Sequence, residues 1–384
     1  MKISLKSWLI VLLQSLCIVA MVLMAIVPFS CKITAEGVKL LVGDYNPPVL
    51  NSVYVVDEST VEFVFSENVR ITGCVVSIVN DEDLFNSMSS SKTKDLSEAL
   101  YAASGMYGSI ESEIFSGESE NIVRIKMKEK MLTGQKYEVY ASVKDSYGNN
   151  LTFAVPFIGY NGRVPKIILS EIQSASVSSQ TKSEKENGFY RNEFVELLCL
   201  SDGNLSGIEI ISANDGEQKR YVLPAVEVCK GEIVVVHLRN RGNGCVSEEG
   251  DDLNLAKSSY SSVGIRDLWS KCEETVLGNK TDIVVLRNSL NKELIDAVMY
   301  RDSSIEEWSN KFSDYAQQVY EAGIYSSSEI DCASVTTGLT DTKTIFRKNA
   351  SELRTRVLSG EDIELPVVCD AGEWIVGTES AGRL

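Results

Sequence analysis

Alternating apolar and polar side chains predict β-strands along much of the chain. In the stretch "TVEFVF", Val61, Phe63 and Phe65 share one face and Glu62 lies on the other. The turn "DEST" separates this strand from an apolar strand before it, which predicts a hairpin with one wet face. The run 131–157 supplies two more strands, with Gly148-Asn149-Asn150 as the turn between them.

The stretch "RNEFVELLCLSDGNLSGIEIIS", residues 191–212, predicts two strands joined by a polar turn. In its first strand, Glu196 shares a face with apolar neighbours, and the opposite face, which includes Cys199, is apolar as well. The strand is therefore expected to be buried on both sides, with a carboxylate in its middle. Glu196 is either a catalytic or metal-binding group or a structural hydrogen-bond acceptor.

Further strands are predicted at "PKIILSEIQSA", "RYVLPAVEVCKGEIVVVHL", "KTDIVVLRNSLNKELIDAVMY" and "AGEWIVG". One segment has helical periodicity instead: Trp308, Phe312, Tyr315 and Val319 recur at spacings of three and four residues. This predicts an amphipathic helix over 303–323 that packs on the sheets, with an exposed partner-binding face as the alternative.

The N-terminus carries the pattern of an exported protein. Lys2 and Lys6 precede an apolar run from Trp8 to Val27, and small Ser30 stands before Cys31. Cys31 is thus the candidate lipid-attachment residue of a sequence that resembles a bacterial lipoprotein leader over residues 1–30. A cleaved signal peptide and an uncleaved membrane anchor remain alternatives, since the run is long enough to span a bilayer. All three place the remainder outside the cytoplasm, in the cell envelope or on the cell surface.

Composition limits the partners. Among 384 residues, 37 Lys+Arg face 54 Asp+Glu, giving a net charge of −17. An acidic chain gains nothing from phosphate counterion release, which argues against nucleic acid as a partner. No two cysteines form a C-x-x-C pair, so zinc knuckles and thioredoxin-like sites are not indicated. An exported chain permits disulfides, and Cys245 and Cys272 could pair.

Two resemblances follow from these stretches. "TVEFVFSENV" and "LTGQKYEVYASVKDSYGNNL" resemble a bacterial immunoglobulin-like domain, which implies a β-sandwich over 47–160. Within it, the Ser-rich segment 81–120 is interpreted as an inserted loop with a short helical piece near "LSEALYAA". The linker "YNGRVPK" is expected to precede a second domain.

That second domain, residues 165–384, resembles the lamin-tail domain. The order "ILSEI", "NEFVEL", "LSGIEI", "KGEIVVV" and "DIVVLRN…ELIDAVMY", closed by "GEWIVGTESAGR", carries the resemblance. It implies an immunoglobulin-type sandwich. The fold class is therefore predicted as mainly β, with two β-sandwich domains in series and one amphipathic helix inserted in the second.

Candidate chemistry is sparse. His237, the one histidine, lies at the end of an apolar strand without a nucleophile motif near it, and is interpreted as structural. Glu171 and Glu196 could approach each other across neighbouring strands, whereas Glu193 points to the opposite face. We interpret Glu171 and Glu196 as structural carboxylates. The acidic loops 80–86 and 247–254 lack EF-hand spacing and are interpreted as solvated.

The sequence thus predicts a non-catalytic envelope lipoprotein that acts as an interaction or structural module. No cofactor, metal or nucleic acid is expected, and the partners would be the membrane, through the N-terminal lipid or anchor, and an envelope protein or glycan. One alternative is an envelope hydrolase that uses Glu171 and Glu196 with a divalent metal. A second is a surface adhesin that binds glycan or protein.

Overall fold

The computed structural model describes residues 44–79, 109–116, 119–174, 186, 193–240, 243–340 and 342–384. The leader with Cys31, the expected helical piece near 96–103 and the acidic stretch 80–86 lie outside these residues. In the part of the chain that is described, no helix is both long and apolar enough to cross a membrane.

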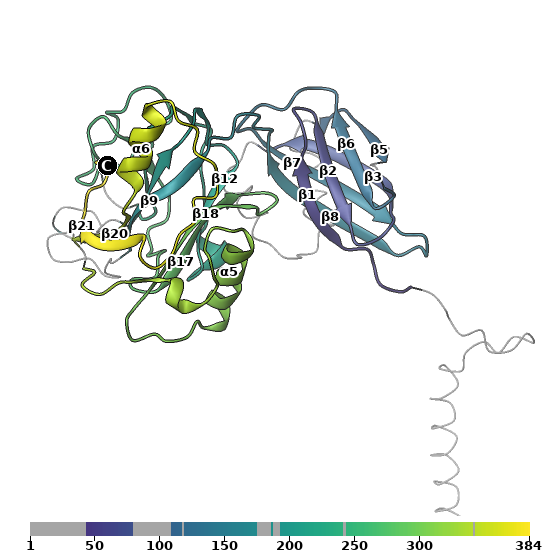
Figure 1. Cartoon of the computed structure of the whole chain (residues 1–384). Helices are drawn as coiled ribbons and strands as arrows, with labels where there is room; N and C mark the ends of the chain where they lie inside the picture. Colours follow the sequence, from purple (N-terminus) through teal and green to yellow (C-terminus); the bar gives the residue numbers. More distant parts are fainter. Residues whose placement is uncertain are drawn as a thin grey trace, which may run out of the picture. The chain divides into compact units, whose positions relative to one another are not determined.

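The first half of the described chain forms two four-stranded sheets (Figure 1). One sheet has the order β1-β2-β6-β5 and the other the order β4-β3-β7-β8. Their bounds are β1 Leu50–Val55, β2 Thr60–Phe65, β3 Arg70–Ile78, β4 Ser109–Ile110, β5 Ser112–Ser116, β6 Ile122–Met127, β7 Lys136–Lys144 and β8 Asn150–Ile158. The predicted hairpins β1-β2 and β7-β8 are confirmed.

One prediction for this region is wrong. The segment 81–120 was expected to be an inserted loop, but its residues 109–116 form β4 and β5, which extend one sheet each. β5 pairs with β6 along five residues, from Ser112 opposite Met127 to Ser116 opposite Val123. The Ser-rich composition hid these short edge strands, because their apolar content is only Ile110, Ile114 and Phe115.

The second half forms a six-stranded sheet, β16-β15-β10-β9-β20-β21, and a five-stranded sheet, β13-β12-β17-β18-β19, with β11 and β14 as a separate pair. The bounds in the six-stranded sheet are β9 Ile167–Gln173, β10 Phe194–Cys199, β15 Ile233–His237, β16 Arg266–Trp269, β20 Lys343–Arg347 and β21 Trp374–Thr378. The others are β11 Gly203–Asn204, β12 Ile208–Ser212, β13 Tyr221–Val222, β14 Glu227–Val228, β17 Asp282–Asn288, β18 Leu294–Arg301 and β19 Ser334–Val335.

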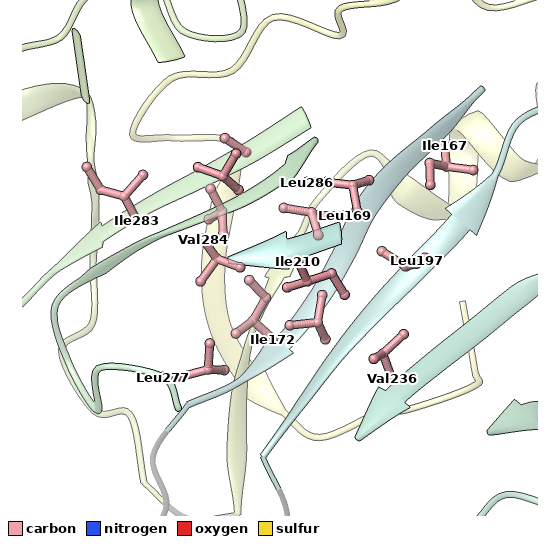
Figure 2. Packing of buried hydrophobic residues seen from close by; sticks show 14 of the residues in the cluster. Ile167, Leu169, Ile172, Leu197, Ile210, Val236, Leu277, Ile283, Val284 and Leu286 are labelled. Carbon is pink, nitrogen blue, oxygen red and sulfur yellow. The ribbon is translucent and has the colours of Figure 1, made fainter. Parts of the chain in front are cut away.

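A hydrophobic core lies between these two sheets. Leu169, Leu197 and Val236 from the six-stranded sheet belong to the same buried cluster as Ile210 and Val284 from the five-stranded sheet, and Figure 2 labels all five. All five are at most 2% exposed. Side chains of both inner faces interdigitate in this way in a β-sandwich, so the predicted fold class, mainly β with sandwich architecture, is confirmed.

The helical predictions need correction. The helix expected over 303–323 is α5, Asn310–Glu321, so its first residues form turns instead. α5 contacts β17 and β18, and its buried Ala316 and Val319 join the core, as expected for a helix that packs on the sheets. A second helix, α6, Ala350–Leu358, was not predicted.

α6 explains why β10 is apolar on both faces. The inner face of β10 belongs to the core between the sheets. On the outer face, Ile168 of β9 and Leu198 of β10 form a second cluster with Leu353 and Val357 of α6. Leu384, the last residue, also packs against this cluster. All six residues of β10 are buried, as the sequence predicted.

Candidate functional site: a buried carboxylate pair

A β-bulge in β9 shapes the candidate site. Glu196 of β10 lies opposite Glu171, but the next residue, Leu197, lies opposite Leu169, so Ser170 is the extra residue of β9. Leu169 and Ile172 on either side both face the core between the sheets. The bulge thereby places Ser170 and Glu171 next to Glu196 on the outer face, since a bulge redirects the side chains of its strand.

Each carboxylate of the pair is enclosed by hydrogen-bond donors. Glu171 Oε1 accepts from Thr344 Oγ1 (2.5 Å) and from the amide of Ser380 (2.8 Å), and its Oε2 accepts from Ser380 Oγ (2.7 Å). Glu196 Oε1 accepts from Ser170 Oγ (2.7 Å) and its Oε2 from the amide of Gly382 (2.6 Å). Both side chains are 0% exposed. Every oxygen of the pair is therefore occupied by a donor from the chain itself.

A buried ion pair holds the inner side of the bulge. The amide of Leu169 donates to Asp296 Oδ2 (2.7 Å), and its carbonyl accepts from Arg347 Nε (2.9 Å). Arg347 Nη2 in turn donates to the same Asp296 oxygen (2.5 Å), and the guanidinium lies over the ring of Trp374. Asp296 and Arg347 thus provide hydrogen-bond partners for the amide and the carbonyl of Leu169, where the bulge interrupts the pairing of β9 with β10.

Burial changes the charge balance at the pair. It raises the pKa of Glu196 to about 7, against the hydrogen bonds from Ser170 and Gly382, and the neighbouring charge of Glu171 adds to the rise. The guanidinium of Arg354 acts in the opposite direction. Two facing carboxylates that both ionise repel each other, which is why the charge of Glu171 contributes to the raised pKa of Glu196.

His237 and Asp267 lie on the same outer face. His237 Nε2 is 2.6 Å from Asp267 Oδ1, and the imidazole stacks on Trp269 with ring centroids 3.7 Å apart. His237 is 0% exposed, and burial lowers its pKa, which favours the neutral ring despite the carboxylate beside it. This packing supports the structural interpretation of the histidine.

Other buried carboxylates hold loops in the same manner. Glu193 Oε2 accepts from the amide of Val276 (2.7 Å). Asp282 accepts from the amides of Gly278 (2.7 Å) and Asn214 (3.0 Å), and burial raises its pKa to about 6. In each case the acidic side chain accepts hydrogen bonds from amides in a loop.

Glu248 corrects an expectation about the acidic loop 247–254. The loop was interpreted as solvated, but Glu248 is 1% exposed. Its Oε1 accepts from the amide of Ala256 (3.1 Å) and its Oε2 from the amide of Asp267 (3.0 Å). Arg266 Nη1 donates to the carbonyls of Glu248 (2.6 Å) and Gly250 (2.7 Å), which fixes the loop further.

Sequence reasoning found Glu171 and Glu196 but missed the residues that complete their surroundings. Ser380 and Gly382 come from the C-terminal segment, 209 and 186 residues away from their acceptors, and Thr344 comes from β20. Their residue types carry no signal of this role. The cysteines of the described residues are all free thiols, so the pairing considered for Cys245 and Cys272 is not formed, and Cys199 is a buried core thiol as predicted.

Fold and site together define a mainly β protein whose second sandwich is fastened by buried carboxylates. The chain belongs to the family whose model is named TP_1001_2nd and described as "protein second domain", which matches residues 165–376, more than half of the chain. A relative from Treponema pallidum (strain Nichols), called "Uncharacterized protein", is 25% identical over 229 residues. The match covers 59% of this chain and 55% of that protein, so the chain spans about half of its relative's length.

Solved structures give weaker likenesses. A DUF4876 family protein from Bacteroides thetaiotaomicron is 11% identical, with a TM-score of 0.28, over 73% of this chain and 84% of that one. The copper resistance protein PcoC from Escherichia coli is 16% identical, with a TM-score of 0.20, over 29% of this chain and 98% of that one. Likenesses at these TM-scores carry no argument about function.

Proposed function

We propose that this chain is an exported lipoprotein of the bacterial cell envelope, anchored through Cys31, and that it acts there as a non-catalytic interaction or structural module. Its parts would be a leader over 1–30, an immunoglobulin-like domain over 47–160 and a lamin-tail-like domain over 165–384. Fold alone does not carry function, so the proposal depends on the site.

The observation that supports the proposal most is the occupancy of the carboxylate pair. A hydrolase that used Glu171 and Glu196 with a divalent metal would need their oxygens free to bind the ion and face a common pocket. Instead, both side chains are fully buried, and each oxygen accepts a hydrogen bond from the chain. Such carboxylates act as structural acceptors, which favours a module over an enzyme.

A chelator separates the two interpretations. Thermal unfolding of the protein is followed by tryptophan fluorescence with and without EDTA, and with added Ca²⁺ or Mn²⁺. If the pair is structural, the midpoint stays the same in all conditions, because no ion contributes to folding. A midpoint that EDTA lowers and metal restores, and that no longer responds in Glu196→Gln, would overturn the non-catalytic proposal.

Labelling with palmitate tests the anchor. Cys31→Ala should remove all label from the full-length protein, because the lipid is attached at that thiol. Cys17→Ala, a cysteine within the apolar leader, is the matched control and should keep the label. Label retained in Cys31→Ala, or a wild-type mature protein that still begins with the intact leader, would contradict the lipoprotein proposal.

The module itself is tested by binding. Residues 32–384, immobilised, should retain a discrete envelope protein or glycan from detergent-solubilised envelopes. The captured molecule is then purified, and its dissociation constant is measured in solution against wild type and against an unrelated β-sandwich protein of similar charge. If no captured molecule binds the wild-type protein more tightly than it binds the unrelated sandwich, the result would contradict an interaction role.

A further inference from the structure

A cavity of about 120 Å³, partly open to solvent, is lined by four segments of the chain. They are the last residues of β1, the residues from the end of β8 into the linker, the turn before β12 and the turn between β17 and β18. The cavity has room for several water molecules but is smaller than the pockets that enclose a drug-sized ligand. It therefore suits one ring-sized unit of a longer ligand.

Hydrogen bonds between these segments hold the walls of the cavity in place. The side-chain NH2 group of Asn161 donates to the carbonyls of Asn204 (2.6 Å) and Ser206 (2.9 Å). The amide of Ser289 donates to the carbonyl of Gly207 (2.8 Å), which joins the turn before β12 to the turn after β17. The fold itself thus forms the cavity without a ligand, as is usual for binding sites.

Two asparagines in the wall have amide groups that are only half used. Asn288 Oδ1 accepts from the amides of Leu290 (2.9 Å) and Asn291 (3.2 Å), and Asn291 Oδ1 accepts from the amide of Glu293 (3.0 Å). Neither side-chain NH2 group has a hydrogen-bond partner within the described chain. Because the backbone holds each oxygen, each NH2 group is a fixed donor that a ligand can use.

Ser206, which also lines the cavity, gives the strongest indication of a ligand. The residue is 2% exposed, and its hydroxyl has no hydrogen-bond partner among the described residues. A buried hydroxyl without a partner costs free energy, and in native proteins such groups usually bond to another group, a water molecule or a ligand. A ligand with hydroxyl groups would supply this partner.

The remaining wall selects the kind of ligand. Tyr54 and Tyr160 add two partly buried aromatic rings, whose faces are apolar and whose hydroxyls can hydrogen-bond. In the part of the chain that is described, no residue that lines the cavity is charged. A charged ligand would lose hydration there without gaining an opposite charge, so the wall favours a neutral ligand.

We propose that the cavity binds one neutral sugar unit of an envelope glycan. A sugar ring is compact and uncharged, and each of its hydroxyl groups both donates and accepts hydrogen bonds. Its oxygens accept from the NH2 groups of Asn288 and Asn291, another hydroxyl bonds to Ser206 Oγ, and the C–H groups of the ring pack on a tyrosine. This inference rests on the proposed function, because it names the class of partner that the module binds.

An NMR titration of the full-length protein, in a detergent without a sugar headgroup, tests the proposal. D-glucose, D-galactose, D-mannose and N-acetyl-D-glucosamine are the neutral probes, and D-glucuronic and D-galacturonic acid are the acidic ones. At least one neutral sugar should bind with a dissociation constant on the order of millimolar, because so small a ligand makes few contacts. Both acids should bind about tenfold more weakly, since the wall offers their carboxylate no cation.

Three variants locate the binding in the cavity. Asn291→Asp keeps the oxygen that accepts from Glu293 but removes the NH2 donor, so sugar affinity should fall about tenfold. Asn254→Asp is the matched control at an exposed asparagine outside the cavity and should bind as wild type does. Ser206→Ala should bind sugar about three- to tenfold more weakly, yet be at least as stable in urea as wild type, because its hydroxyl has no partner to lose.

The outcomes separate this inference from the proposed function. If no neutral sugar binds, if the acids bind as tightly, or if Asn291→Asp and Ser206→Ala bind sugar as wild type does, the inference is wrong. An envelope protein that binds wild type more tightly than Asn291→Asp, while no sugar binds, would assign the cavity to a peptide and leave the module intact. If nothing from envelopes binds, the proposed interaction role fails even where free sugars enter the cavity. The comparison of neutral and acidic sugars needs no substitution, so it decides the matter even if a variant fails to fold.

Discussion

Removing the carboxylate of Asp296 should destabilise the second sandwich far more than removing an exposed acid. In Asp296→Ala, Arg347 keeps its charge in a site where it is 1% exposed, and the amide of Leu169 loses its acceptor. Breaking a buried ion pair in this way costs about 3–5 kcal/mol. The orphaned amide overlaps with that loss, because both share one oxygen, so the two terms do not add.

The matched control lies near α6. Glu361 accepts from Arg356 through both oxygens, at 2.9 Å and 2.5 Å, which is a bidentate geometry. Both partners are more than 40% exposed. Glu361→Ala should therefore cost less than about 1 kcal/mol, as exposed ion pairs do. The contrast between the two variants isolates burial, because an Arg–carboxylate pair is broken in both.

Urea unfolding followed by tryptophan fluorescence measures the difference. Of the four tryptophans, Trp269, Trp308 and Trp374 lie in the second sandwich and the fourth, Trp8, is in the leader, so a protein without the leader reports this sandwich alone. The free energies are compared at equal slope of the denaturant dependence. If Asp296→Ala costs no more than Glu361→Ala, the bulge of β9 is not held by the buried pair and our argument for the site is wrong.

Three further predictions concern the pair and the linker. Glu196→Ala should destabilise the second sandwich by about 1–3 kcal/mol, since Ser170 and Gly382 lose their acceptor, and Glu196→Gln somewhat less; equal stability to wild type in urea would contradict this. Because burial raises the pKa of Glu196 to about 7, its stabilising contribution is complete below about pH 4.5 and is lost as pH rises through 7. Urea titrations between these values should therefore show a smaller decline in Glu196→Gln than in wild type, and parallel curves would refute the assignment. Limited trypsin digestion should cut first at exposed Arg163 in the linker or within 89–94. A fragment from residue 164 onward should melt cooperatively on its own. If it shows no cooperative transition, the two sandwiches share a core.

Periodicity predicted the parts of the fold that depend on local patterns. β10 was predicted to be buried on both faces because apolar residues occupy both the even-numbered and the odd-numbered positions of the strand, and all six of its residues are buried. α5 was found from the spacing of Trp308, Phe312, Tyr315 and Val319, although the helix itself begins at Asn310. α6 was missed because only Ala350, Leu353 and Val357 mark its buried side in a segment of nine residues, too few for the pattern to stand out.

The surroundings of the site could not be predicted in the same way. Glu171 and Glu196 were recognised because an acidic side chain in an apolar strand is unusual. The donors that were missed are Thr344, Ser380 and Gly382, and residues of these types are common throughout the chain. Whether a carboxylate is open or enclosed depends on contacts across about two hundred residues, as the separations of 186 and 209 show. Local pattern holds no information about them.

The recurrence of buried acids in the second sandwich has a common physical cause. An interrupted ladder leaves amides that must find an acceptor inside the protein, and a carboxylate can accept from several at once. Asp296 does so for the bulge at Leu169, Glu193 for the loop at Val276, and Glu248 for Ala256 and Asp267. Asp296 and Glu193 accept from amides 127 and 83 residues away, whereas Glu248 accepts from amides 8 and 19 residues away. The Glu171 and Glu196 pair differs from these in one respect: two acids face each other, and among the described residues the segment that they hold, 380–382, belongs to no strand.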